Sequence, residues 1–158
     1  MSLLELFQSV QFSEPLIAMR ASPWFFPVIA TIHLMGLAVI GGAVLLVDLR
    51  LLGFGLRRQP VAALWADAQR WLVGGLIVML ATGLLLFMCF ATKYYYLAFF
   101  WVKMAALVRV VVFTYSIQRR VVMAEESKTS ARRNRAVALV SLSLWATVAL
   151  GGRYIGFP

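Results

Sequence analysis

The stretch PWFFPVIATIHLMGLAVIGGAVLLV, residues 23–47, contains no lysine, arginine, aspartate or glutamate. A bilayer core about 30 Å thick is spanned by about 20 apolar residues in helical conformation, so this stretch is long enough to cross a membrane. Three further stretches of mostly apolar residues meet the same requirement, at about 71–92, 97–118 and 136–152. Together they predict an all-α fold, an integral membrane four-helix bundle in which residues 1–158 form a single transmembrane domain.

The composition supports a membrane protein. Of the 158 residues, 63% are hydrophobic and 13% are charged, whereas soluble domains are nearer half apolar and a quarter charged. The net charge of +9 does not indicate nucleic-acid binding, because the basic residues occupy short gaps between the apolar stretches. The single cysteine, Cys89, excludes an intrachain disulfide and a multi-cysteine metal site, and its apolar surroundings predict an inert core residue.

The segment before the first span predicts a separate helix. Over about residues 3–20, the apolar residues of LLELFQSV fall on one face at helical spacing, which predicts an interfacial amphipathic helix on the membrane with a break near Pro15. Ser22 is the expected N-cap of the first span and Pro23 its first helical residue. Pro60 is expected to open the helix that leads into the second span.

The basic residues between the spans predict the orientation. Ten of them occupy the gaps between spans one and two and between spans three and four, and three lie on the other side. The positive-inside rule therefore places both basic gaps in the cytoplasm. We expect a multi-pass protein of the bacterial inner membrane with both termini in the periplasm. Asp48, at the end of the first span, is expected to pair with Arg50 or another basic residue of that gap.

Ionisable residues inside the spans are the candidate functional residues, because they are costly in a bilayer. At about 1.5 Å per residue, His33 lies roughly 13 Å and Lys103 roughly 9–12 Å below the outer ends of their spans, in one layer. Met88 approaches this layer from the second span, and Arg153 lies just above it. Arg109 lies deeper, and it is about 120° around the helix from Lys103, so the two cannot face the same partner.

No carboxylate occupies these layers to balance the basic residues. An anionic ligand would balance them: the propionates of a haem, a lipid phosphate or a small anion. Snorkelling and hydrogen bonds to carbonyl groups are the structural alternative. His33 is a candidate axial ligand of b-type haem, with Lys103, Met88, water or another subunit in the sixth position. A hydrogen-bonded structural histidine remains the alternative.

Three stretches carry a resemblance to known proteins: HLMGLAVIGGAVLLVDLRLLG, FFWVKMAALVRV and LWATVALGGRYIGF. They resemble a family of uncharacterised bacterial four-span membrane proteins. More distantly, the arrangement resembles HemJ-type protoporphyrinogen oxidases and CopD-like membrane domains. HemJ-type proteins have a histidine in an early span and a lysine in a later one, both linked to haem b, and His33 and Lys103 match these in order and depth. The resemblance implies haem binding more than porphyrinogen oxidation.

Three functions follow as hypotheses. The first is a b-type haem protein for electron transfer or porphyrin chemistry, in which Arg153 pairs with a propionate and a quinone or other redox partner is a candidate. The second is an accessory or scaffolding subunit of a larger complex or homo-oligomer, with Arg109 binding lipid or a neighbouring subunit. The third, a small transporter that attracts anions, is the weakest, because no broken helix or paired half-repeat is evident.

Overall fold

The computed structural model describes residues 3–55, 59–124 and 130–155. Four of its helices are long and apolar enough to cross a membrane, as expected for a multi-pass membrane protein. They are α3 (Phe25–Leu52), α4 (Val61–Cys89), the continuous run Ala98–Met123 and α8 (Ala131–Ile155). The described residues contain no strand, so the predicted all-α four-helix bundle is confirmed.

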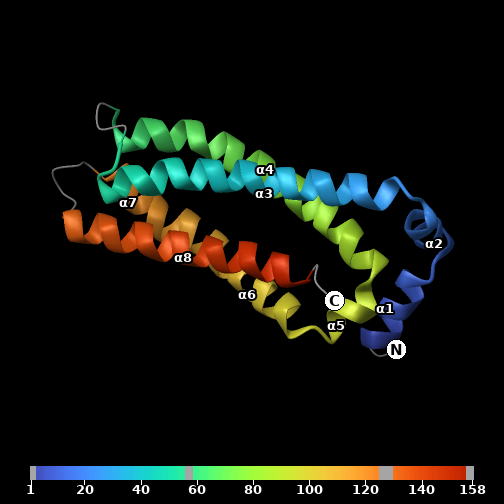
Figure 1. Cartoon of the computed structure of the whole chain (residues 1–158). Coiled ribbons are helices and arrows are strands. Elements are labelled where there is room, and N and C mark those ends of the chain that lie inside the picture. The colour runs from blue at the N-terminus through green and yellow to red at the C-terminus, as the bar shows by residue number, and fades with distance from the viewer. Residues whose placement is uncertain (1–2, 56–58, 125–129, 156–158) are drawn as a thin grey trace.

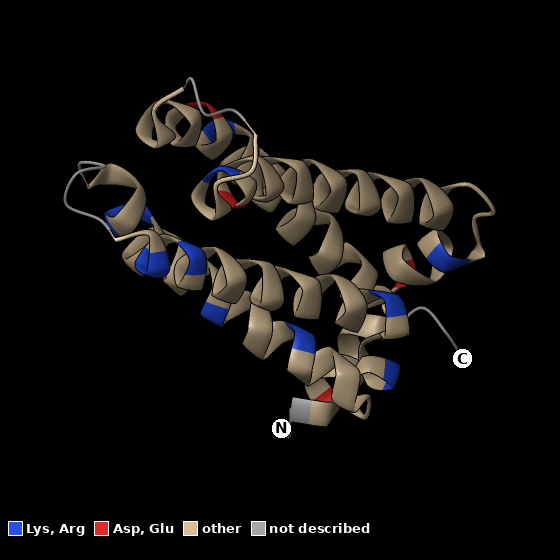
Figure 2. Cartoon of the chain, turned by 60° about the vertical axis from the view of Figure 1, so that its left-hand side comes forward, with Lys and Arg blue, Asp and Glu red and all other residues tan. Residues whose placement is uncertain are grey.

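The four long helices run antiparallel to their neighbours (Figure 1). α3 packs against α4 and α8, and α8 packs in turn against α6 (Ala98–Phe113). We call the end where α3 ends and α4 begins, and where α8 also begins, the basic end. Many of the lysines and arginines lie there (Figure 2). We call the opposite end, where the first helices of the chain lie, the terminal end.

Glycines allow α3 and α4 to approach closely. A Cβ atom added at Gly75 would lie 2.8 Å from Ile40 Cγ1 and 3.1 Å from the Gly36 carbonyl oxygen. Without a hydrophobic driving force in lipid, helices associate through close contacts of this kind, which small residues permit. Apolar side chains with at most 3% exposure then fill the interior, among them Ile40, Val110 and Val148.

The N-terminal segment forms two short helices, α1 (Leu3–Gln11) and α2 (Glu14–Ala21), that cover the terminal end. The expected break falls before α2, and Pro15 lies inside its first turn, where a missing N–H costs nothing. α1 packs against α5 (Ala91–Tyr95), and the Thr92 backbone N–H donates to Gln11 Oε1 at 2.8 Å. Arg20 Nη1 donates to the Cys89 carbonyl oxygen at 2.9 Å.

Several predicted helix limits need correction. α3 begins at Phe25 with Trp24 as its N-cap, so the predictions of Ser22 as N-cap and of Pro23 as the first helical residue were wrong. Ser22 Oγ accepts a hydrogen bond from the Phe25 N–H instead. The prediction that Pro60 opens α4 is confirmed. All four spans extend past the predicted apolar stretches at the basic end, because helices continue into the headgroup layer, where polar residues are tolerated. At the terminal end α4 stops at Cys89, so the predicted limit of residue 92 was wrong.

The third span contains an irregular turn near its basic end. α6 continues through a π-helix, η1 (Thr114–Gln118), into α7 (Arg119–Met123). Single π turns of this kind occur frequently at functional sites. At this turn Gln118 is 1% exposed and Thr114 is fully buried.

Candidate functional site

His33 and Lys103 line the same cavity, near the terminal end of the bundle. The cavity has a volume of about 530 Å³ and lies between α3, α4 and α6. We call it the histidine pocket; its lining includes His33, Met79, Gly83, Phe87, Phe100 and Lys103. Except for the imidazole and the ammonium group, the side chains named here are apolar. The two candidate residues therefore face a common apolar space, from two different helices.

A hydrogen-bond chain links His33 to Thr82 and to the backbone of α4. The Thr82 hydroxyl donates its single proton to the Val78 carbonyl oxygen at 2.6 Å. His33 Nδ1 lies 2.9 Å from Thr82 Oγ1, which has only lone pairs left for this contact. The direction of this contact depends on the tautomer of His33, and while the Thr82 proton is directed at Val78, Nδ1 carries the hydrogen and donates it. In a neutral imidazole this leaves the lone pair on Nε2, which is the atom able to bind a metal or accept a proton.

Glycines make room for both basic side chains. A Cβ atom at Gly83 would lie 3.0 Å from His33 Cε1, so the imidazole packs directly against the α4 backbone. On α8, a Cβ at Gly151 would lie 3.1 Å from Lys103 Cβ, and one at Gly152 would lie 3.3 Å from Lys103 Nζ. Among the described residues, no hydrogen bond or ion pair engages the Lys103 ammonium group, so its donors are free for a ligand.

The other candidate residues lie outside the histidine pocket. Met88 is half-buried near the end of α4, and Arg153 is exposed in the last turn of α8. Arg109 is exposed on another face of α6, as its position about 120° from Lys103 requires. Cys89 is fully buried.

Sequence reasoning missed the two methionines of the pocket and the threonine that orients His33. Met79, Gly83 and Phe87 follow one another at intervals of four on α4, so they share a face. Met104 lies next to Lys103 on α6. The interval of four residues on α4 and the position of Met104 beside Lys103 could have identified these side chains. That identification would first have required knowing which face of α4 packs toward α6.

The aromatic residues between α4 and α6 form one wall of the pocket. The Phe87 and Phe100 rings stack with centroids 5.2 Å apart, and the Tyr94 ring stacks on Phe100 at 5.7 Å. Outside the spans, burial raises the pKa of the Tyr94 phenol above its usual value. This cluster lies at the terminal end, as a membrane-interface belt would, and it also shapes the pocket.

A second polar cluster lies near the basic end. Asp48, Gln118 and Ser141, from α3, η1 and α8, are each at most 1% exposed. Gln118 Nε2 donates to Asp48 Oδ1 at 2.7 Å, and Ser141 Oγ lies 3.5 Å from Gln118 Oε1. The predicted pairing of Asp48 with Arg50 was wrong. Two residues turn a helix by about 200°, so Arg50 points away and its Nε donates to the Gln59 carbonyl oxygen.

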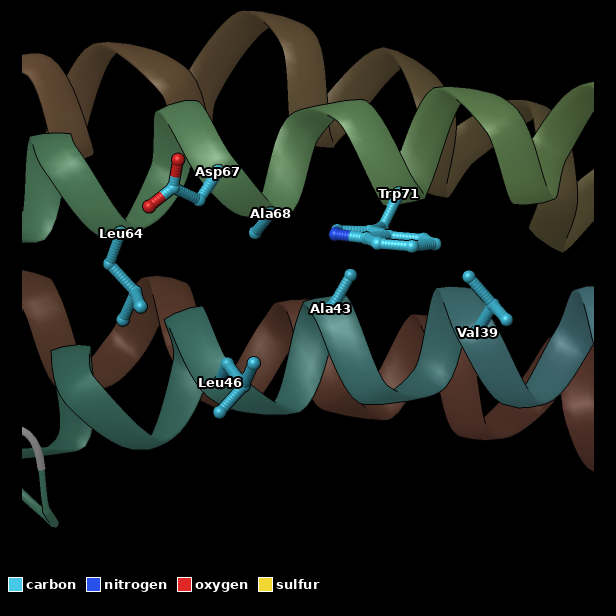
Figure 3. A pocket seen from close by; sticks show the side chains of 7 residues that line it. All are labelled: Val39, Ala43, Leu46, Leu64, Asp67, Ala68 and Trp71. Atoms are coloured by element: carbon cyan, nitrogen blue, oxygen red, sulfur yellow. The ribbon is translucent and has the colours of Figure 1, made fainter.

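A third feature is a shallow apolar groove between α3 and α4, with a volume of about 330 Å³. Asp67, Ala68 and Trp71 reach it from α4, and Val39 and Ala43 reach it from α3 (Figure 3). Trp71 is 67% exposed. The groove thus lies on the outer, lipid-facing surface of the bundle and carries one carboxylate, that of Asp67.

Among the described residues, no three His, Cys, Asp or Glu side chains gather to hold a bare metal ion. His33 could supply one ligand only, to a metal that brings its other donors with it, as iron does in a porphyrin.

No curated protein and no solved structure is similar enough to match the chain. A family model does match, and it covers residues 24–158, which include all four long helices. The chain therefore belongs to the family described as a family of unknown function (DUF6644).

Proposed function

We propose that the protein binds a b-type haem in the histidine pocket, with His33 Nε2 as the axial ligand. The observation that carries this proposal is the hydrogen-bond chain from His33 Nδ1 through Thr82 to the Val78 carbonyl oxygen. Histidines that bind metals almost always donate their other ring N–H to a fixed acceptor, which sets the tautomer and the ring orientation. A structural histidine would also be hydrogen-bonded, so the proposal rests as well on the cavity that His33 shares with Lys103.

The pocket also fits the rest of such a group. Its volume of about 530 Å³ falls in the range of about 300–1,000 Å³ that is usual for cofactor sites. The apolar walls suit the macrocycle, and Lys103 is available to pair with a propionate as an ammonium group or, after it loses a proton, to serve as a second ligand through the neutral amine. Arg153, at the same end of the bundle, would pair with a propionate. A bound haem supplies one-electron chemistry, for electron transfer or for porphyrin or quinone redox reactions.

The resemblance of His33 and Lys103 to the histidine and lysine of HemJ-type proteins supports the same proposal. We assign the protein to a bacterial inner membrane with both termini in the periplasm, as the distribution of basic residues favours. Arg57, Arg58 and Lys128, which belong to that distribution, lie outside the described residues. In this orientation the histidine pocket opens in the outer half of the bilayer.

An absorption spectrum tests the haem proposal. Protein purified in detergent from haem-replete cells should show a Soret band and reduced α and β bands, and His33→Ala should abolish them. Thr82→Val should weaken haem binding about 10- to 100-fold, the usual cost of losing a partner that orients a ligand. A colourless wild-type protein would end the proposal.

Thr147→Val is the matched control for Thr82→Val. Thr147 donates to the Ser143 carbonyl oxygen at 2.8 Å, as Thr82 donates to that of Val78, but Thr147 is exposed and touches no histidine. It should leave the spectrum unchanged. Equal losses in both variants would mean that the threonine matters to the helix and not to His33.

Arg109 favours a second function, that of a subunit in an assembly. It lies in the middle of the third span beside Val108 and Val112, which are 61% and 62% exposed, so this face points away from the bundle. No ion pair holds Arg109 within the described part of the chain. Leaving an arginine in contact with lipid at mid-span costs about 2.5–3.5 kcal/mol on insertion scales, so a covering partner is favoured.

We infer that the partner is a second copy of this chain, whose Asp67 meets Arg109. The hydrogen bond between Gln118 and Asp48 places these two residues at the same height along the bundle axis, which aligns the third span with α3. The residues that line the groove align α4 with α3 in the same way. At about 1.5 Å per residue, Arg109 and Asp67 then lie about 8 Å apart along the bundle axis, within reach of a long side chain. The two lie on different faces, so the contact is heterologous, and it gives a closed ring where the rotation between copies closes.

Exchange of the two charges tests this assembly. Arg109→Asp and Asp67→Arg should each reduce the oligomer in nanodiscs, and the double variant should restore it. A wild-type protein that is monomeric at every concentration would contradict the assembly. So would a double variant no better than the single ones.

A further inference from the structure

The buried cluster near the basic end contains a carboxylate without a counter-charge. Asp48 is 0% exposed, and its Oδ1 accepts one hydrogen bond from Gln118. Asp48 Oδ2 is buried and has no hydrogen-bond partner, and no cation forms an ion pair with Asp48 within the described residues. A buried carboxylate in this situation takes up a proton or a cation, because the isolated charge is too costly in an apolar interior.

The charged side chains named below, on the helices around Asp48, are directed away from its carboxylate. On α3, Arg50 donates to the Gln59 carbonyl oxygen. Beside Gln118, Arg119 and Arg120 are exposed, as are Asp67 on α4 and Arg135 on α8. The surroundings of Asp48 are instead uncharged polar groups: the Gln118 amide and the Ser141 hydroxyl.

The cluster offers too few oxygens to hold a metal cation. Gln118 Oε1 is engaged with Ser141, and Asp48 Oδ1 with the Gln118 amide. The remaining buried oxygens without a partner on the facing helices are Asp48 Oδ2 and, one turn from Gln118, Thr114 Oγ1. Hard cations such as Ca²⁺ take about six to eight oxygens and Mg²⁺ six, so a proton fits this cluster better.

A cleft lies at the basic end, on the water side of the cluster, and none of its lining residues belongs to the cluster itself. It has a volume of about 220 Å³ and is lined by Arg50, Gly53, Asn134 and Arg135 among others. Asn134 Oδ1 is buried and has no partner, so it is an acceptor ready for water. Asn134 lies two helical turns before Ser141 on α8, on the same face. The buried side chains of Val137 and Ala138 lie between them on this face, and the π turn η1 lies beside Ser141.

We propose that Asp48 is a proton-binding site that exchanges its proton with water at the basic end, through the cleft that Asn134 lines. In its protonated form the carboxyl keeps the hydrogen bond from Gln118 on Oδ1 and carries the proton on Oδ2. Ionisable residues of this kind inside spans are characteristic of proton relays. The site lies on α3 about 22 Å from His33, at about 1.5 Å per residue, so it does not depend on haem binding.

Infrared spectroscopy of the protein in nanodiscs tests the proposal. At neutral pH the wild-type protein should show the carbonyl stretch of a protonated carboxyl, and this band should shift in D₂O. Asp48→Asn should remove the band, whereas Glu14→Gln, which changes an exposed acid at the terminal end, should retain it. Because the amide oxygen introduced by Asp48→Asn can still accept the hydrogen bond from Gln118, this variant should unfold at the same denaturant concentration as the wild type.

The entrance is tested by the rate of deuterium exchange. Asn134→Leu should slow the shift of the Asp48 band, and Ser143→Ala, at an exposed position of the same helix, should leave it unchanged. A wild-type protein without the band at neutral pH would overturn the proposal. So would a band that does not exchange, an exchange rate that Asn134→Leu does not alter, or a stabilisation by Na⁺ that Asp48→Asn abolishes.

Discussion

Two adjacent glycines on α4, Gly74 and Gly75, allow the close contact between α3 and α4 to be tested by substitution, because only one of them lies at that contact. Gly74 faces open space, since an added Cβ would meet nothing within 4 Å. At Gly75 the same Cβ would lie 2.8 Å from Ile40 Cγ1 and 3.1 Å from the Gly36 carbonyl oxygen. Ile40 is fully buried and the oxygen belongs to the α3 backbone, so neither can move without moving the helix.

The expected magnitudes follow from these contacts. Both changes to alanine gain roughly 0.5–1 kcal/mol of helix propensity, which cancels when the two variants are compared. Overpacking a tight interior costs about 1–3 kcal/mol. Gly75→Ala should therefore be less stable than Gly74→Ala by about 1–3 kcal/mol, or about 5- to 150-fold in the unfolding constant.

Reversible unfolding in mixed micelles, followed by circular dichroism, would measure this difference. Gly74→Ala should be at least as stable as the wild-type protein. If Gly75→Ala were as stable as Gly74→Ala, the close contact between α3 and α4 would not exist as described. The position of His33 against Thr82 and Gly83, which depends on the same interface, would then lose its support.

Three further predictions concern the site and the terminal end. Gly83→Ala should displace the imidazole, because its Cβ would lie 3.0 Å from His33 Cε1, and the Soret absorbance should fall relative to Gly74→Ala. Arg20→Met removes the hydrogen bond to the Cys89 carbonyl oxygen, so α2 should exchange its amide hydrogens faster while the amides of α3 are unaffected. Burial, and then the Cys89 thiol, raises the pKa of Tyr94. The unfolded chain therefore releases this proton first, and the free energy of unfolding should fall as the pH rises through about 10, less so in Tyr94→Phe.

The fold was predictable because its signal is local. A stretch such as 23–47 spans a bilayer by its length and composition alone, whatever it packs against. The shared depth of His33 and Lys103 was predictable for the same reason, since the rise per residue is fixed. That these two residues line one cavity also required the directions of their side chains, which spacing within one helix does not provide.

Asp48 shows where sequence reasoning fails. Its position next to a basic gap favoured a surface ion pair, because the apolar stretch ends there. The helix continues to Leu52, however, so Asp48 remains inside the bundle on the face toward Gln118. Gln118 is itself the last residue of the third predicted span. A hydropathy profile does not reveal a buried pair of polar residues at the ends of two spans. The pair is evident only when it is known which faces of the two helices pack together.

The two polar sites lie on one helix and are separated by apolar packing. Between His33 and Asp48, the buried residues of α3 are Gly36, Ile40, Ala43, Val44 and Val47, all apolar. At these levels α6 and α8 contribute Val110 and Val148, at most 1% exposed. The described residues thus form no continuous polar path through the bundle, which disfavours a channel within one chain.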